Sequence, residues 1–122
     1  MKNIFLTLVL GMFSLNSFAL DINGEPYEFT GSISTITLTD EGGVINAVGE
    51  TGQYGKVWLT YNLNLDNPAT PNQGSFTGRA VAIDGDGNRN SATRQGVWER
   101  KGKMMHFKSL DDVSDGNQYL CI

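Results

Sequence analysis

The stretch KVWLTYNLNL (residues 56–65) shows the clearest alternation of apolar and polar side chains in this chain of 122 residues. Successive side chains of an extended strand point to opposite faces. One face of this stretch carries Val57, Leu59, Tyr61, Leu63 and Leu65, and the other carries Lys56, Thr60, Asn62 and Asn64. The pattern predicts a strand with one buried face, and Trp58, on the polar face, is expected to lie over a neighbouring strand.

Short runs of β-branched and aromatic residues, separated by turn residues, continue on both sides of this strand. They predict six further strands, over 28–39, 44–50, 75–83, 91–100, 103–110 and 118–122. In the first of these, the apolar phase changes between Ile33 and Ile36, which indicates a β-bulge. The two glycines at 42–43 and the pair Lys101-Gly102 are typical of tight hairpin loops. The long loop is 66–74, which contains two prolines.

The fold class follows from these runs, because no helical period of useful length appears after the N-terminal segment. We expect an all-β domain, an antiparallel up-and-down barrel of seven to eight strands, with a two-sheet β-sandwich as the alternative. Its predicted core contains Val57, Leu59, Tyr61, Leu63, Phe76, Val81, Trp98 and Phe107.

The N-terminal segment has the features of a secretory signal peptide. Lys2 is its one charge, the apolar run over 4–13 is too short to cross a bilayer, and Ser17 and Ala19 suit a signal peptidase. The sequence therefore predicts a signal peptide over 1–19 and a single β domain over 20–122. No later segment is long and apolar enough to span a membrane, so we expect a secreted or periplasmic protein.

The charge balance argues against nucleic-acid binding, because removal of Lys2 with the signal peptide takes the formal net charge from −4 to −5. Cys121 is the single cysteine, so no intramolecular disulfide can form. Three alternatives stay open for it: a small buried apolar residue, a residue of a frayed terminus, or one half of an intermolecular disulfide.

The segment RQGVWERKGKMMHFKSL (94–110) combines Arg, Glu and Lys with the one His of the chain. Placing the hairpin turn at Lys101-Gly102 puts Glu99 and His106 on one face in diagonal positions, and Trp98, Met105 and Phe107 on the other. A general base needs an orienting partner, and Glu99 is the local candidate for His106. The alternative is a histidine on the surface or the barrel rim.

Two acidic loops raise the question of a metal site. Asp84, Asp86 and Asn88 occur at every second position, a spacing at which side-chain oxygens can surround a hard cation such as calcium. A helix-loop-helix calcium site, however, needs a Gly where this chain has Arg89 and a Glu where it has Gln95. A loop solvated by its own polar groups is the alternative, and the loop that begins at Asp111-Asp112 is equally ambiguous. With one His and one Cys, the chain is poor in ligands for transition metals, and we expect no cofactor.

Candidate ligand-binding residues come from the arginines and aromatic residues. A symmetric loop over 84–88 would place Arg79 and Arg94 close to opposite one another on neighbouring strands, where an anionic headgroup or carboxylate ligand could lie between them; two splayed surface arginines are the alternative. Trp58, Tyr61 and Trp98 are candidates to line a barrel mouth that holds a small apolar or amphipathic molecule.

The segments GSFTGRA (74–80), DGDG (84–87) and GVWERKG (96–102) resemble, in order and spacing, small bacterial barrel domains of the allene oxide cyclase-like kind. The resemblance covers the C-terminal half of the chain. It implies an antiparallel barrel with an apolar interior and assigns no catalytic residue here. Three functions are expected from the sequence: a binding module, a small isomerase or hydrolase using His106 and Glu99, or a non-catalytic envelope or surface interaction protein.

Overall fold

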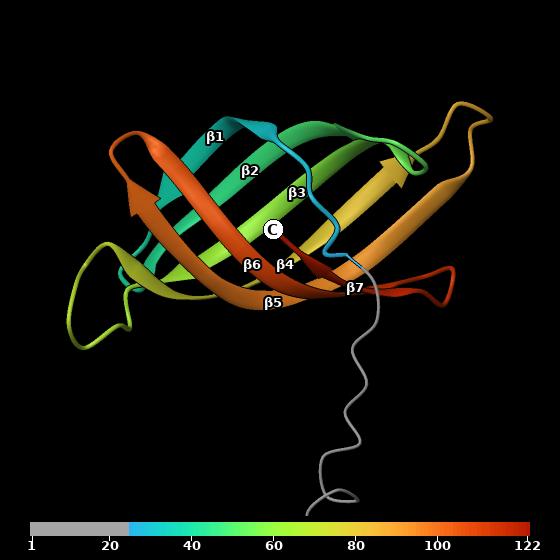
Figure 1. Ribbon diagram of the computed structural model, residues 1–122. Helices are drawn as coiled ribbons and strands as arrows, with labels where there is room; N and C mark the ends of the chain where they lie inside the picture. The colour runs from blue at the N-terminus through green and yellow to red at the C-terminus, as the bar shows by residue number, and fades with distance from the viewer. Residues whose placement is uncertain (1–24) are drawn as a thin grey trace, which may run out of the picture.

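The computed structural model describes residues 25–122 (Figure 1). Within this range the chain forms strands and no helix, and each strand pairs antiparallel with the next along the chain. The strands are β1 (Gly31–Leu38), β2 (Gly42–Thr51), β3 (Gly55–Asn64), β4 (Gln73–Ile83), β5 (Arg89–Lys101), β6 (Met104–Val113) and β7 (Gln118–Cys121). The prediction of an all-β antiparallel fold is confirmed, and all seven predicted strands are present.

The predicted bulge lies in β1. Ile33 is opposite Ala47, but Thr35 is opposite Asn46, so Ser34 is the extra residue. Its hydroxyl donates to the Asn46 carbonyl at 3.0 Å. Without an extra residue, Ile33 and Ile36 would point to opposite faces of the sheet. The bulge places both side chains on the same face, opposite Ala47 and Ile45.

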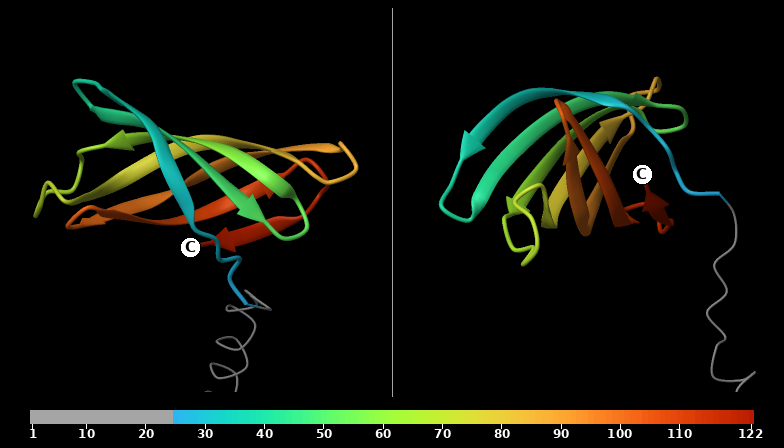
Figure 2. Two further views of the ribbon diagram at one scale, coloured as in Figure 1. Left: turned by 90° about the horizontal axis from the view of Figure 1, so that it is seen from above. Right: turned by 60° about the vertical axis from the view of Figure 1, so that its left-hand side comes forward.

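The sheet rolls up strongly, so that its two ends approach each other (Figure 1 and Figure 2), but it does not close into a continuous barrel. The extended segment before β1 joins the ends at one point, a parallel bridge between Tyr27 and Cys121. Tyr27 donates to the Leu120 carbonyl at 2.8 Å and accepts from the Ile122 amide at 3.0 Å. Further along, β1 pairs with β2 alone and the first half of β6 pairs with β5 alone, which leaves a gap in the wall.

The core fills the concave side of the rolled sheet. Each strand from β2 to β5 turns one apolar face inward, as the alternation in 56–65 predicts; the buried members are Ile45, Ala47, Val57, Leu59, Tyr61, Leu63, Phe76, Ala80, Ala82, Ala92 and Trp98. Two residues differ from the prediction. Leu65 lies beyond the end of β3 and is exposed, and Val81 lies opposite Trp58 on the outer face. Leu65 departs from the inward pattern because β3 ends at Asn64, and Val81 because the alternation in β4 turns Phe76, Ala80 and Ala82 inward.

The predicted signal peptide, and with it the proposed cut between Ala19 and Leu20, lies outside the described residues. Residues 25–122 contain no helix of the length and apolarity that crossing a bilayer requires.

Candidate ligand-binding cleft

An open cleft occupies the gap in the wall, between the β1–β2 hairpin and β6. Its volume is about 1420 Å³, ample for a small organic ligand. The floor is aromatic and aliphatic: Tyr61 and Phe107 stack with ring centres 3.9 Å apart, and Leu59 lies beside them. Phe76 packs edge-on against Phe107 at 5.4 Å. Packed aromatic rings therefore form part of the cleft lining.

β1 carries aliphatic side chains that the protein itself leaves uncovered, and the first of them, Ile33, lines the cleft. Ile33 pairs with Ala47 and Ile36 with Ile45, so both share the concave face with these buried residues. Ile33 is nevertheless 42% exposed, Ile36 59% and Leu38 85%. On the opposite side, Met105 and Phe107 of β6 are half-buried. We call Ile33, Ile36 and Leu38 the β1 stripe.

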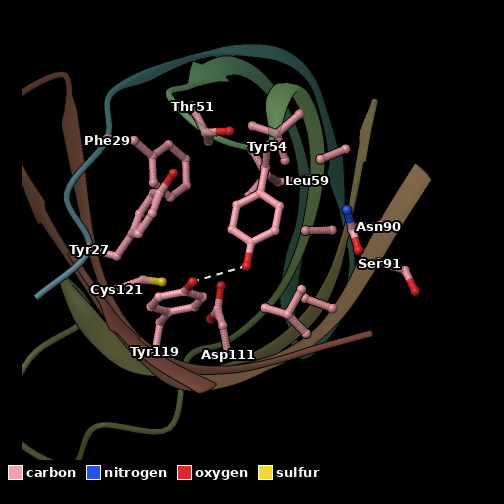
Figure 3. A pocket seen from close by; sticks show the side chains of 15 residues that line it. Tyr27, Phe29, Thr51, Tyr54, Leu59, Asn90, Ser91, Asp111, Tyr119 and Cys121 are labelled. Carbon is pink, nitrogen blue, oxygen red and sulfur yellow. Dashed lines mark hydrogen bonds between the residues drawn. The ribbon is translucent and has the colours of Figure 1, made fainter. Parts of the chain in front are cut away.

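A second, smaller cavity of about 60 Å³ lies near the Tyr27–Cys121 bridge (Figure 3). Small side chains leave this space, among them Ala80, Ala82 and Ala92, and most of its lining is apolar. It is smaller than the roughly 150 Å³ apolar cavity that accommodates benzene, so it has room for a short alkyl group but not for a whole ring.

Tyrosines gather at this end of the rolled sheet. The Tyr54 hydroxyl donates to Asp115 at 2.6 Å and lies 3.0 Å from the Tyr119 hydroxyl (Figure 3), to which Gln53 also donates. Burial, with the hydrogen bonds to Asp115 and Tyr119, raises the pKa of Tyr54, while the same bond lowers the pKa of Asp115. At neutral pH the network therefore joins a neutral phenol to a charged carboxylate.

A buried ion pair borders both spaces, because Asp111 lines the cavity and Arg94 lines the cleft. The Nε of Arg94 donates to Asp111 at 2.8 Å, and its Nη2 donates to the Ser109 hydroxyl at 3.1 Å. Ser109 in turn donates to Asp111 at 2.7 Å. Arg94 is 4% exposed, and its Nη1 is buried without a hydrogen-bond partner among the described residues.

Aromatic rings hold the Arg94 guanidinium in place. Its Cζ lies 4.8 Å from the centre of the Tyr61 ring and 5.8 Å from that of Phe29, distances at which a cation is attracted to the ring face. Burial by itself would lower the pKa of Arg94, but Tyr61 and Asp111 outweigh it and raise the pKa. The guanidinium is thus a fixed positive charge whose counter-ion is Asp111.

Cys121 is buried in the wall next to this pair, which agrees with the alternative of a small buried residue. Burial, followed by the nearby charge of Asp111, raises the pKa of its thiol from 9.0 to about 12. The thiol is therefore protonated at neutral pH.

Several ligand candidates from the sequence are placed differently by the structure. Arg79 lies opposite Thr93 and is exposed on the outer face, whereas Arg94 lies opposite Gly78 and points inward, so the predicted arginine pair does not form. Trp58 also lies on the outer face, where Lys56 sits 5.1 Å from its ring centre. Tyr61 and Trp98 do point into the barrel and line the cleft.

The candidate catalytic pair, Glu99 and His106, lies on the face of β5 and β6 opposite to Trp98 and Phe107, although both residues also contribute to the lining of the cleft. The hairpin turn is centred one residue later than predicted, at Gly102-Lys103, so Glu99 lies directly opposite His106 and not diagonal to it. Gly102 has a φ of 61° at the first turn position, where a type II′ turn places a glycine. Glu99 accepts from Gln73 at 3.0 Å and from Lys101, and these contacts lower its pKa. No nucleophile lies within hydrogen-bond distance of His106 among residues 25–122.

The Asp84 loop uses its acceptors internally. Asp84 accepts from the backbone amides of Asp86 and Asn88, both at 2.9 Å, and these bonds lower its pKa. Across the described part of the chain, no three His, Cys, Asp or Glu side chains gather as metal ligands would. In the second acidic segment, Asp111 belongs to β6 and points inward, so the prediction that it lies in a loop is wrong.

The inward position of Asp111 had a signal in the sequence. Alternate residues of β6, starting from the apolar Met105 and Phe107, continue through Ser109 and Asp111 to Val113. Polar residues in the middle of this series conceal it, because a buried carboxylate needs a partner that only the folded chain supplies, here Arg94.

No protein-family model matches the chain, and no curated protein or solved structure proved similar to it. The resemblance to allene oxide cyclase-like barrels stays a prediction.

Proposed function

We propose that this protein is exported to the periplasm or the medium and binds a small apolar or amphipathic molecule in the cleft between β1 and β6. Export rests on the predicted signal peptide. Binding rests on the cleft, where Tyr61, Trp98 and Phe107 contribute aromatic surface and β1 contributes aliphatic surface.

One observation carries the proposal: the β1 stripe is exposed on the concave face of the sheet. Exposed aliphatic side chains that occur singly are ordinary, but three on the same concave face of one strand, the first of which, Ile33, lines the cleft, mark a surface that gains free energy when covered. Each buried aliphatic side chain contributes about 1.5–3 kcal/mol. The outer faces of the neighbouring strands instead carry polar groups such as Thr60 and Asn62.

The test uses the neutral fluorescent probe N-phenylnaphthylamine and a Trp58→Phe background, in which Trp98 is the single tryptophan. Because Trp98 lines the cleft, binding is expected to enhance probe emission and to quench Trp98 by energy transfer. Ile33→Glu places a charge in the cleft and should weaken binding at least about tenfold. Leu110→Glu, on the outer face of the sheet, is the matched control and should leave binding unchanged.

Equal loss in both variants, or no binding in the parent protein, would reject the proposal. Native mass spectrometry of the same sample distinguishes ligand binding from the interaction-protein alternative. If a second copy of the chain covers the β1 stripe, the parent protein should be a dimer and Ile33→Glu should make it a monomer. The enzyme alternative is tested by His106→Ala once a substrate that binds the cleft is known.

A further inference from the structure

We infer that the cleft selects a ligand whose head is an uncharged acceptor oxygen, such as an ester or amide carbonyl, bound by the Nη1 edge of Arg94. This inference rests on the proposed function, since it specifies the head of the molecule that the cleft holds. The basis is that some N–H groups of Arg94 already donate hydrogen bonds within the protein and others do not.

The guanidinium has donors left over on one edge. Nε and Nη2 lie on the side edge, and they donate to Asp111 and Ser109. Nη1 has two N–H groups, and neither has a partner among the described residues. A buried donor without a partner carries a desolvation cost that an incoming acceptor removes. Since Arg94 lines the cleft, a ligand in the cleft is the available source of that acceptor.

The charge balance decides which acceptor fits. Asp111 lies 2.8 Å from Arg94 and is itself 9% exposed in its side chain, so the pair is already neutral. A ligand carboxylate would leave one uncompensated negative charge in a buried site and would repel Asp111. A carbonyl oxygen accepts the same hydrogen bonds from a charged donor without adding a charge.

The predicted anionic ligand needed a second cation, and the structure removes it. Arg79 is on the outer face, away from the cleft. Lys103 and Lys108 also line the cleft, but both are exposed to solvent. The buried charged residues beside the cleft are Arg94 and Asp111, one cation and one anion, and the selection of a neutral head is a consequence of that equality.

The test compares three molecules of equal chain length, methyl decanoate, decanoate and decane, as competitors of N-phenylnaphthylamine at neutral pH. Methyl decanoate is expected to bind about tenfold more tightly than decane, which lacks an acceptor, and more tightly than decanoate. Decanoate binding as tightly as the ester, or decane doing so, overturns the inference while the proposed function stands. If none of the three displaces the probe and the probe itself fails to bind, the proposed function has failed instead.

Asp111→Asn is the decisive variant. Asparagine keeps the shape and an acceptor oxygen for Nε of Arg94 but removes the negative charge, so the site becomes cationic. Its preference should then switch from methyl decanoate to decanoate. An unchanged order of affinities in a folded Asp111→Asn protein would contradict the inference.

A double variant, Arg94→Met with Asp111→Leu, guards against misfolding of the single variants. Replacing a buried ion pair by apolar residues of similar volume is often neutral for stability. This protein should bind decane as the parent does and lose the preference for the ester. A preference that persists would show that Arg94 does not hold the head, and would overturn the inference.

Discussion

Gly78 lies opposite Arg94 in the ladder between β4 and β5, and opposite Tyr61 in the ladder between β3 and β4. The Cζ of Arg94 lies 4.8 Å from the centre of the Tyr61 ring. The residue between these two large side chains in the sheet has no Cβ, and its backbone approaches the Thr60 carbonyl of β3 too closely to admit one.

Gly78→Ala should therefore be destabilising. A Cβ at this position would collide with the backbone carbonyl of Thr60, which cannot move without disturbing the β3–β4 ladder. We expect a loss of about 1–3 kcal/mol in the free energy of unfolding, measured by urea titration. Gly85→Ala is the control, because a Cβ there meets nothing; it should stay within about 0.5 kcal/mol of the parent. Equal effects would refute the role assigned to Gly78.

Arg94→Met should cost more than the double replacement of the ion pair. Removal of Arg94 alone leaves Asp111 buried without its counter-ion, which costs about 3–5 kcal/mol. Adding Asp111→Leu removes the unpaired charge and should recover most of that loss. Urea unfolding of both single variants and the double variant measures the coupling, and additive effects would show that the two charges do not interact.

Cys121 should be unreactive in the folded protein. Its pKa of about 12 keeps the thiol protonated at neutral pH, and its side chain is buried. A disulfide reagent such as dithionitrobenzoate should therefore react many times more slowly with native protein than with protein in urea. Rapid labelling of the native state would show that the thiol is accessible, and a dimer on a non-reducing gel would support the alternative of an intermolecular disulfide.

The strand pattern was predictable because local alternation alone determines it. KVWLTYNLNL and its neighbours specify seven strands, and the phase change between Ile33 and Ile36 locates the bulge. The gap in the wall was not predictable, since it depends on how far the rolled sheet brings β1 towards β6. The arginine placement failed although the register is the symmetric one: Ile83 pairs with Arg89 and Arg79 with Thr93, so Arg94, one residue further along β5, has its side chain on the face opposite to that of Arg79.

Stability should fall at alkaline pH. The pKa of Cys121 rises from 9.0 to about 12 on folding, and burial also raises that of Tyr61 above its ordinary 10.0. Both groups bind their protons more tightly in the folded chain, so their stabilising contribution is complete below pH 9.0 and is lost as the pH rises towards about 12. The melting temperature should decline over this window. Cys121→Ala should make the melting temperature decline less steeply with pH. An unchanged slope would show that titration of Cys121 does not cause the loss of stability.

The β1 stripe should matter for binding but not for folding. Ile33 lines the cleft and is 42% exposed, so Ile33→Thr removes little buried surface, and threonine suits a strand as well as isoleucine does. We expect a change in unfolding free energy within about 0.5 kcal/mol, together with weaker binding of N-phenylnaphthylamine. Leu110→Thr is the matched control, because Leu110 is also an exposed aliphatic residue but lies on the outer face of β6, outside the cleft. If Ile33→Thr unfolds the protein or leaves probe binding unchanged, β1 supports the fold and not the ligand.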